Sequence, residues 1–150
     1  MKFVLLVMLF VCFVLIAVAV YFFYYIRYLI FKDLYYISGY IKNNIVFNKN
    51  SISDILSTCK DNVSLYTRLY ISKKNIKYFK MMNNNDKKNI DMFFDSLGKG
   101  NVDYEINNLN YYENVFNNLM INSKENVNSK GIVYLKLVIL FGVIVVILLI

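Results

Sequence analysis

Two long apolar segments, one near each end of the chain, constrain its fold most strongly. Residues 3–26 carry no charged side chain, and residues 132–150 carry only Lys136. A helix of about 20 apolar residues crosses a hydrocarbon core about 30 Å thick, so both segments are long enough to span a membrane. The sequence therefore predicts transmembrane helices over residues 1–26 and 132–150, which enclose one domain over residues 27–131.

The first segment also has one feature of a cleaved signal peptide. Ala17-Val18-Ala19 resembles the small-residue site at which such peptides are cut. However, the apolar run continues beyond this site to Ile26, and only Lys2 precedes it as a positive charge. The pattern favours an anchor that is not cleaved.

Basic residues beside the spans predict how the chain is oriented. Arg27, Lys130 and Lys136 lie on the domain side of the spans, whereas only Lys2 lies on the other side. Because positive charge is enriched on the cytoplasmic side, these four membrane-flanking residues predict a cytoplasmic domain in a two-span membrane protein. Lys136 lies about one turn inside its span, where it either extends its ammonium group to the interface or pairs with a partner's carboxylate.

The middle of the chain shows the apolar repeat of helices and no run of strand alternation. In its clearest stretch, Ile90, Phe93, Phe94 and Leu97 share one face of a helix that begins at Asp86. Further apolar faces are formed by Leu34, Ile37, Ile41 and Ile45, and by Ile106, Leu109, Phe116 and Met120. The pattern predicts an all-α fold, a small antiparallel helical bundle flanked by two transmembrane helices.

A shorter repeat over residues 63–71 predicts one more helix of this bundle. Its apolar residues are Leu65 and Leu69, with Tyr66 beside them. We expect these three side chains to face the core, because apolar residues at helical spacing normally mark the buried face.

The residues of most catalytic sites are missing from the sequence. The chain has no histidine, and its two cysteines, Cys12 in a span and Cys59 in the domain, are too far apart to act together. Gly98-Lys99-Gly100 lacks the spacing of a phosphate-binding loop. We therefore expect no enzyme, no metal site, no cofactor and no small-molecule substrate, and we expect both thiols to be buried.

The domain is mildly basic. It holds 15 of the 17 basic residues and all 10 acidic ones, a net charge of about +5. This charge fits either a solvated surface or attraction to anionic lipid headgroups. With only Arg27 and Arg68 as arginines, the sequence does not indicate nucleic-acid binding.

The order of these features resembles the stage III sporulation protein AB family of endospore-forming bacteria. Three segments carry the resemblance: residues 44–47 with 51–55, the helix of residues 91–98 that ends in Leu97-Gly98, and the closing stretch 130–150 with Leu140-Phe141-Gly142. The resemblance implies structural roles for Phe47, Asp54, Leu97 and Gly98.

The same resemblance implies a function and a set of partners. It indicates a non-enzymatic scaffold in the mother-cell membrane, within the stage III sporulation channel complex that joins the mother cell to the forespore. The domain would be similar to the cytoplasmic domain of type II secretion platform proteins, and would couple a cytoplasmic sporulation ATPase to channel subunits. A small pore-forming or lysis-type membrane protein that acts by oligomerisation is the alternative reading of the two spans.

Overall fold

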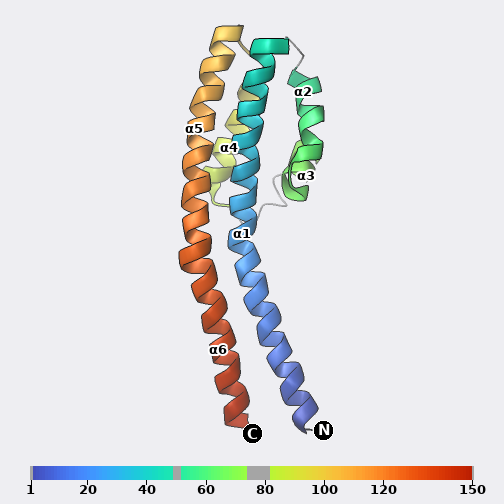
Figure 1. Ribbon diagram of the computed structural model, residues 1–150, viewed down its shortest axis with the longest axis vertical. Coiled ribbons are helices and arrows are strands. Elements are labelled where there is room, and N and C mark those ends of the chain that lie inside the picture. The colour runs from blue at the N-terminus through green and yellow to red at the C-terminus, as the bar shows by residue number, and fades with distance from the viewer. Residues whose placement is uncertain (1, 49–51, 74–81, 150) are drawn as a thin grey trace. The chain divides into compact units, whose positions relative to one another are not determined.

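The structure, a computed structural model, describes residues 2–48, 52–73 and 82–149 (Figure 1). Within these ranges every regular element is a helix and no strand occurs, which confirms the all-α prediction. In chain order the elements are α1 (Lys2–Asn48), α2 (Ile52–Cys59), the 3-10 turn η1 (Lys60–Asn62), α3 (Leu65–Lys73), α4 (Asn84–Ser96), α5 (Val102–Asn126), the π-helical turn η3 (Val127–Gly131) and α6 (Ile132–Leu149).

The chain divides into two compact units. The hairpin unit comprises Met1–Ile26 and Asn122–Ile150, and the bundle unit comprises Arg27–Ile121. The limits predicted from the sequence, at residues 26/27 and 131/132, mark where the apolar segments begin and end, whereas the two units divide by their packing at 26/27 and 121/122. They remain predictions about the membrane-spanning parts of the chain.

In the hairpin unit, the first half of α1 and α6 lie side by side and antiparallel, with both chain ends at one end of the pair (Figure 1). The two helices approach closely at Gly142, where an added Cβ would lie 2.8 Å from the Cβ of Phe13. Phe13 also meets Phe141 edge to face, with ring centroids 5.8 Å apart. Close approach at a small residue is typical of paired membrane helices, because it increases van der Waals contact between them.

The rest of the hairpin surface is apolar and exposed. Both helices reach a mean hydropathy above 3, yet only 6% of each most apolar window is buried. The core helix of a soluble protein would instead be mostly buried, so these surfaces fit a lipid environment. Cys12 is exposed on this surface, and the expectation that both thiols are buried is therefore wrong for Cys12.

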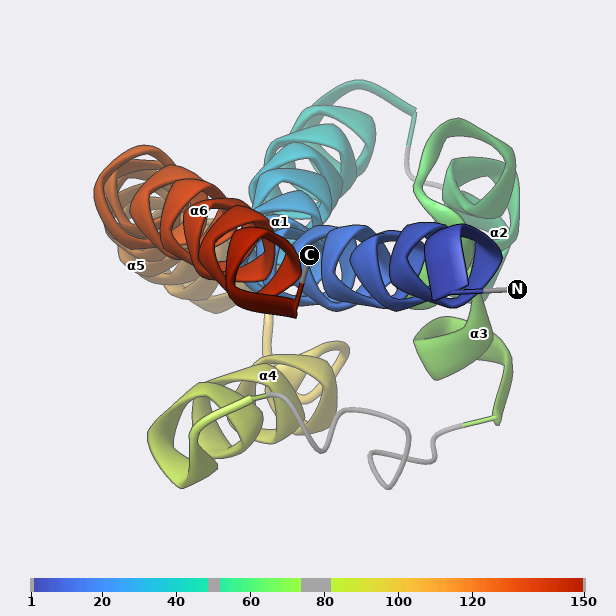
Figure 2. The ribbon, with the colours of Figure 1, turned by 90° about the horizontal axis from the view of Figure 1, so that it is seen from below.

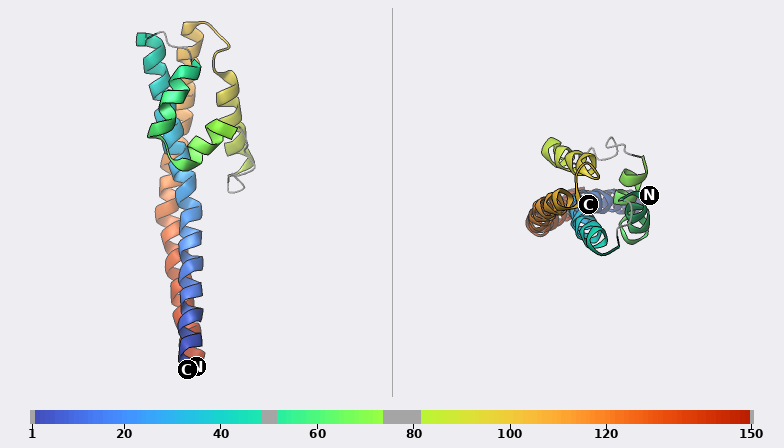
Figure 3. Two further views of the ribbon diagram at one scale, coloured as in Figure 1. Left: turned by 90° about the vertical axis from the view of Figure 1, so that its right-hand side faces the viewer. Right: turned by 90° about the horizontal axis from the view of Figure 1, so that it is seen from above.

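In the bundle unit, α5 lies antiparallel along one side of α1, while α2 and α3 lie along another side (Figures 1 and 2). α4 covers a third side of this arrangement (Figure 3). The second half of α1 is therefore the central helix, which explains why Leu34, Ile37 and Ile41 are all buried.

An aromatic cluster forms the core between α1, α4 and α5. Phe93 is completely buried, and its ring centroid lies 5.2 Å from that of Tyr112 and 5.1 Å from that of Phe116. Phe116 also stacks on Phe31 of α1 at 6.4 Å. Burial of Phe93 confirms that the apolar face predicted for α4 is a core face.

The face predicted for α3 is wrong. Leu65, Leu69 and Tyr66 are exposed, whereas Thr67 is almost completely buried. The physical reason is a hydrogen bond, because the Thr67 hydroxyl donates to the carboxylate of Asp33 on α1 and so turns the apolar side of α3 outward. A buried polar contact has overridden the apolar repeat here.

Candidate functional site

Two of the three segments that carry the family resemblance, residues 44–47 with 51–55 and residues 91–98, come together at one end of the bundle unit (Figure 1). We name this region the motif end and define it as the last turn of α1, the first turn of α2 and the turn that joins α4 to α5. An added Cβ at Gly98 would lie 3.4 Å from the Cδ1 of Ile52, so the α4–α5 turn contacts the start of α2. Phe47 belongs to the last turn of α1.

The α4–α5 turn is built by residues suited to its backbone. Leu97 is extended after the last residue of α4, and Gly98 follows with a φ of 76°, a left-handed conformation that glycine adopts without steric cost. Asn101 then caps α5, because its Oδ1 accepts a 2.9 Å hydrogen bond from the backbone N–H of Tyr104. These residues fix the angle between the two helices.

The start of α2 contains Asp54, one of the residues that carry the family resemblance. Asp54 lies in the first turn and is exposed, and its backbone carbonyl accepts hydrogen bonds from the hydroxyls of Ser57 and Thr58. Ser51, which immediately precedes α2, lies outside the described residues.

Glu105 adds an unusual electrostatic feature to the motif end. Its carboxylate is buried, and Oε1 accepts a 3.1 Å hydrogen bond from the backbone N–H of Gly100. Its second oxygen, Oε2, has no hydrogen-bond partner among the described residues. A polar oxygen that is buried without a donor costs free energy.

The motif end also exposes apolar side chains. Val46 lies in the last turn of α1, and Val102 and Tyr104 lie in the first turn of α5; all three are about half exposed. This exposed apolar surface suits contact with another protein better than catalysis.

At the opposite end of the bundle unit, Arg27 links α1 to α4. Its guanidinium binds the buried carboxylate of Asp86 through two hydrogen bonds, Nε–Oδ2 at 2.8 Å and Nη2–Oδ1 at 3.2 Å. It also lies 5.4 Å from the ring centre of Phe31. Arg27 therefore has a structural contact that its predicted membrane-flanking role did not include.

The start predicted for α4, at Asp86, is two residues too late. The helix begins at Asn84 rather than at Asp86, and Asn83 caps it by accepting a hydrogen bond from the backbone N–H of Asn85. Asp86 is 3% exposed and faces the bundle, where it contacts Arg27.

Asp33 on α1 holds the start of α3. Its Oδ2 accepts hydrogen bonds from the backbone N–H of Ser64 at 2.9 Å, from the Ser64 hydroxyl, and from the Thr67 hydroxyl at 2.7 Å. A carboxylate at a helix N-terminus also interacts favourably with the helix dipole. Asp33 thus fixes the position of α3 on α1.

The remaining membrane-flanking residues belong to the hairpin unit. Lys130 lies in the π-helical turn and is exposed, and Lys136 is exposed one turn into α6. Lys136 borders a shallow apolar groove lined by Leu140 and Val143. The side chain of Lys2 is not among those that the structure describes.

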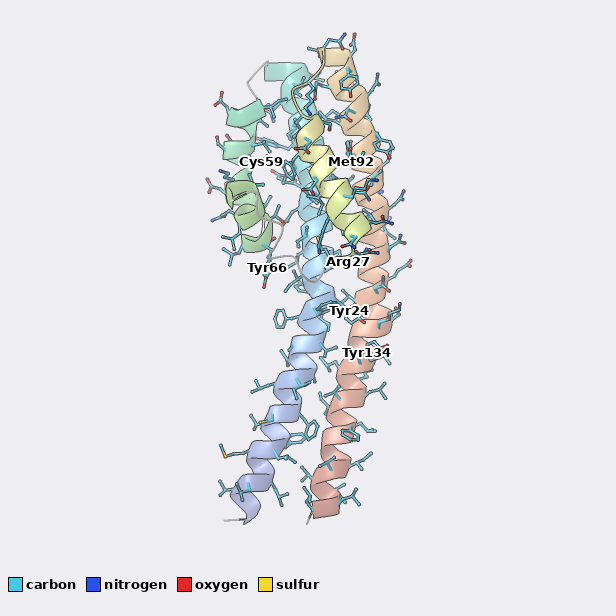
Figure 4. All side chains as sticks on the ribbon, turned by 180° about the vertical axis from the view of Figure 1, so that it is seen from behind. Tyr24, Arg27, Cys59, Tyr66, Met92 and Tyr134 are labelled. Atoms are coloured by element: carbon cyan, nitrogen blue, oxygen red, sulfur yellow. The ribbon has the colours of Figure 1, made fainter. Side chains whose placement is uncertain are left out.

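The aromatic residues of the hairpin unit pair across its two helices. Tyr24 of α1 and Tyr134 of α6 point toward one another and stack with ring centroids 6.2 Å apart (Figure 4). An added Cβ at Gly131 would lie 3.5 Å from the Cβ of Tyr24, an ordinary van der Waals distance, so the two helices are also in contact beside the stacked rings.

The described residues hold no group of histidine, cysteine and acidic side chains that could bind a metal ion. Cys59 is buried, and burial raises the pKa of its thiol to about 11. Burial likewise raises the pKa of Tyr112. A thiol with such a high pKa stays protonated near neutral pH and is a poor nucleophile.

The comparison with protein families decides the identity of the chain. The model of stage III sporulation protein AB matches residues 60–150, which is more than half of the sequence. The chain belongs to this family. No curated protein and no solved structure matches it.

Family membership agrees with the structure on several points. The protein takes part in stage III of sporulation and is associated with a membrane, to which its two apolar helices are suited. The family is a component of the sporulation machinery and is not a known family of enzymes. Of the eight predicted site residues, Leu97, Gly98, Lys130 and Lys136 lie within the matched range, and Lys2, Arg27, Phe47 and Asp54 precede it.

Proposed function

We propose that this protein is a non-enzymatic membrane scaffold of the stage III sporulation channel complex. In this role it couples a cytoplasmic ATPase to the membrane subunits of the channel. It acts in the mother-cell membrane, with the bundle unit in the cytoplasm and both termini on the other side.

The family match carries this proposal, because it assigns the chain to stage III sporulation. The paired apolar helices support a role in a membrane complex, since two spans would anchor the domain between them to the membrane. The uneven distribution of basic residues around the spans supports the cytoplasmic placement. The implied similarity to type II secretion platform domains belongs to the same proposal.

The motif end is the surface that we assign to the ATPase. Asn48 follows Ile26 by 22 residues on the same helix, a rise of about 33 Å at 1.5 Å per residue. The last turn of α1 is therefore far from the span along the chain, where a soluble partner would reach it without steric conflict with lipid. The exposed Val102 and Tyr104 provide apolar contacts suited to a protein surface.

Fusions of a reporter enzyme that is active only outside the cytoplasm test the predicted orientation. A reporter fused after Ile71 should be inactive, because this position lies in the bundle unit. The matched control is the same reporter fused after Ile150, where it should be active. Activity after Ile71 would show that the domain lies outside the cytoplasm, and the proposed contact with a cytoplasmic ATPase would then be wrong.

A further inference from the structure

Helix α3 exposes apolar side chains that the packing of the bundle does not use. Leu65 is 64% exposed and Leu69 is 42% exposed. Both lie on the side of α3 opposite Thr67, whose hydroxyl is bonded to Asp33 on α1. This hydrogen bond holds the leucines in an outward position, so their exposure is a consequence of the fold.

Positive charge is concentrated in the same part of the sequence. Residues 60–80 contain six basic residues and one acidic residue, a net charge of +5. The rest of the segment 27–131 contains nine basic and nine acidic residues, so its charges cancel. The whole positive excess of the domain therefore lies in the sequence segment that contains α3, and such a concentration of charge is attracted to an anionic surface.

The anchor of α3 lies close to the membrane span along the chain. Asp33 follows Ile26, the last residue of the apolar segment, by seven residues on the same helix, a rise of about 10 Å. Within the bundle unit, Tyr66 lies at the same end as Arg27, which directly follows the span (Figure 4). The polar headgroup layer adds about 5–8 Å to each side of the hydrocarbon core, so along α1 Asp33 lies only a few ångströms beyond this layer, a gap that side chains of the attached helix can bridge.

From these three observations we infer that α3 lies on the bilayer surface, with Leu65 and Leu69 inserted among the headgroups of anionic lipid. Leucine and tyrosine beside basic residues are the composition of helices that lie in a membrane interface. A protein partner would also cover apolar residues, but it would not explain why the entire charge excess lies in the same segment as these leucines. Together with the two spans, this contact would fix the tilt of the bundle unit relative to the membrane.

The absence of tryptophan from the chain makes a direct test possible. The full-length L69W variant, reconstituted in phosphatidylcholine vesicles with and without phosphatidylglycerol, reports on its surroundings through a single indole. The matched control is M92W, because Met92 is 51% exposed on α4 and lies farther from the end that holds Arg27 (Figure 4). Lipids brominated in the upper part of the acyl chain quench an indole that contacts them.

We expect L69W to show a blue-shifted emission and a loss of fluorescence with brominated lipid, both larger when phosphatidylglycerol is present. M92W should keep the emission of an indole in water and remain unquenched. Emission of L69W that matches M92W would overturn the inference. A blue shift without quenching by brominated lipid would also overturn it, since it would assign the face to a protein contact, including a second copy of this chain. Equal quenching without the anionic lipid would contradict the role given to charge.

Discussion

Replacing Phe93 with alanine is expected to lower the free energy of unfolding by about 3–5 kcal/mol. The side chain is completely buried, and its ring lies within 5.2 Å of the ring centroids of Tyr112 and Phe116. Alanine would leave a cavity between rings that α4 and α5 hold in place. Urea unfolding of the purified full-length protein in mild detergent, followed by circular dichroism, measures the change.

The neighbouring Met92 provides the control for this measurement. It lies on the same helix but is half exposed, so Met92→Ala should change the free energy of unfolding by no more than about 0.5 kcal/mol. If Phe93→Ala were as stable as Met92→Ala, Phe93 would not be a core residue and the aromatic cluster would not hold α4 to α5.

Removing the guanidinium of Arg27 should also destabilise the bundle unit strongly. Arg27→Ala leaves the carboxylate of Asp86 buried without its bidentate partner, and the loss of one member of a buried ion pair costs about 3–5 kcal/mol. Because the arginine side chain is still 24% exposed, we expect the free energy of unfolding to fall by about 3 kcal/mol, the lower end of this range. The same unfolding measurement in detergent gives the value.

A double-mutant cycle separates this ion pair from other roles of Arg27. Arg27→Ala combined with Asp86→Ala should cost clearly less than the sum of the two single changes, because the second change removes the unpaired charge. Lys32→Ala, an exposed basic residue on the same helix, should have almost no effect. Additive costs in the cycle would mean that Arg27 and Asp86 do not stabilise each other.

The helices of this protein follow directly from its sequence. An apolar run long enough to cross a bilayer predicts a span whatever its partners are, and this reasoning identified the helices that now appear as the first half of α1 and as α6. The spacing of Ile90 and Phe93 likewise predicted a buried face, because an apolar repeat of helical period has to be covered.

Contacts between distant polar residues could not be predicted in the same way. Arg27 and Asp86 are 59 positions apart, and nothing in the local pattern of either residue indicates the other. Asp33 is a comparable case, since its hydrogen bonds to Ser64 and Thr67 decide which face of α3 is buried. The inward face predicted for Leu65 failed for this reason: the apolar repeat was correct, but a polar contact determined the rotation of the helix.

The candidate site shows the same difference between local and distant information. A helix end at Gly98 can be predicted from the sequence, because glycine readily adopts the left-handed conformation that ends a helix. The structure has this conformation at Gly98. The packing of that turn against Ile52 and the unpaired oxygen of Glu105 depend on the tertiary fold, and no sequence pattern indicated either one.

Site-specific photo-crosslinking in sporulating cells tests the proposed scaffold role most directly. A photoreactive amino acid at Tyr104 of the motif end should form an adduct with the proposed cytoplasmic ATPase, because this side chain is exposed beside Gly100 in the α4–α5 turn. The same group at Lys32, exposed on α1 near the span, should form none. An ATPase adduct at Tyr104 alone is the result that our account predicts. No adduct at Tyr104, or equal adducts at both positions, would contradict it.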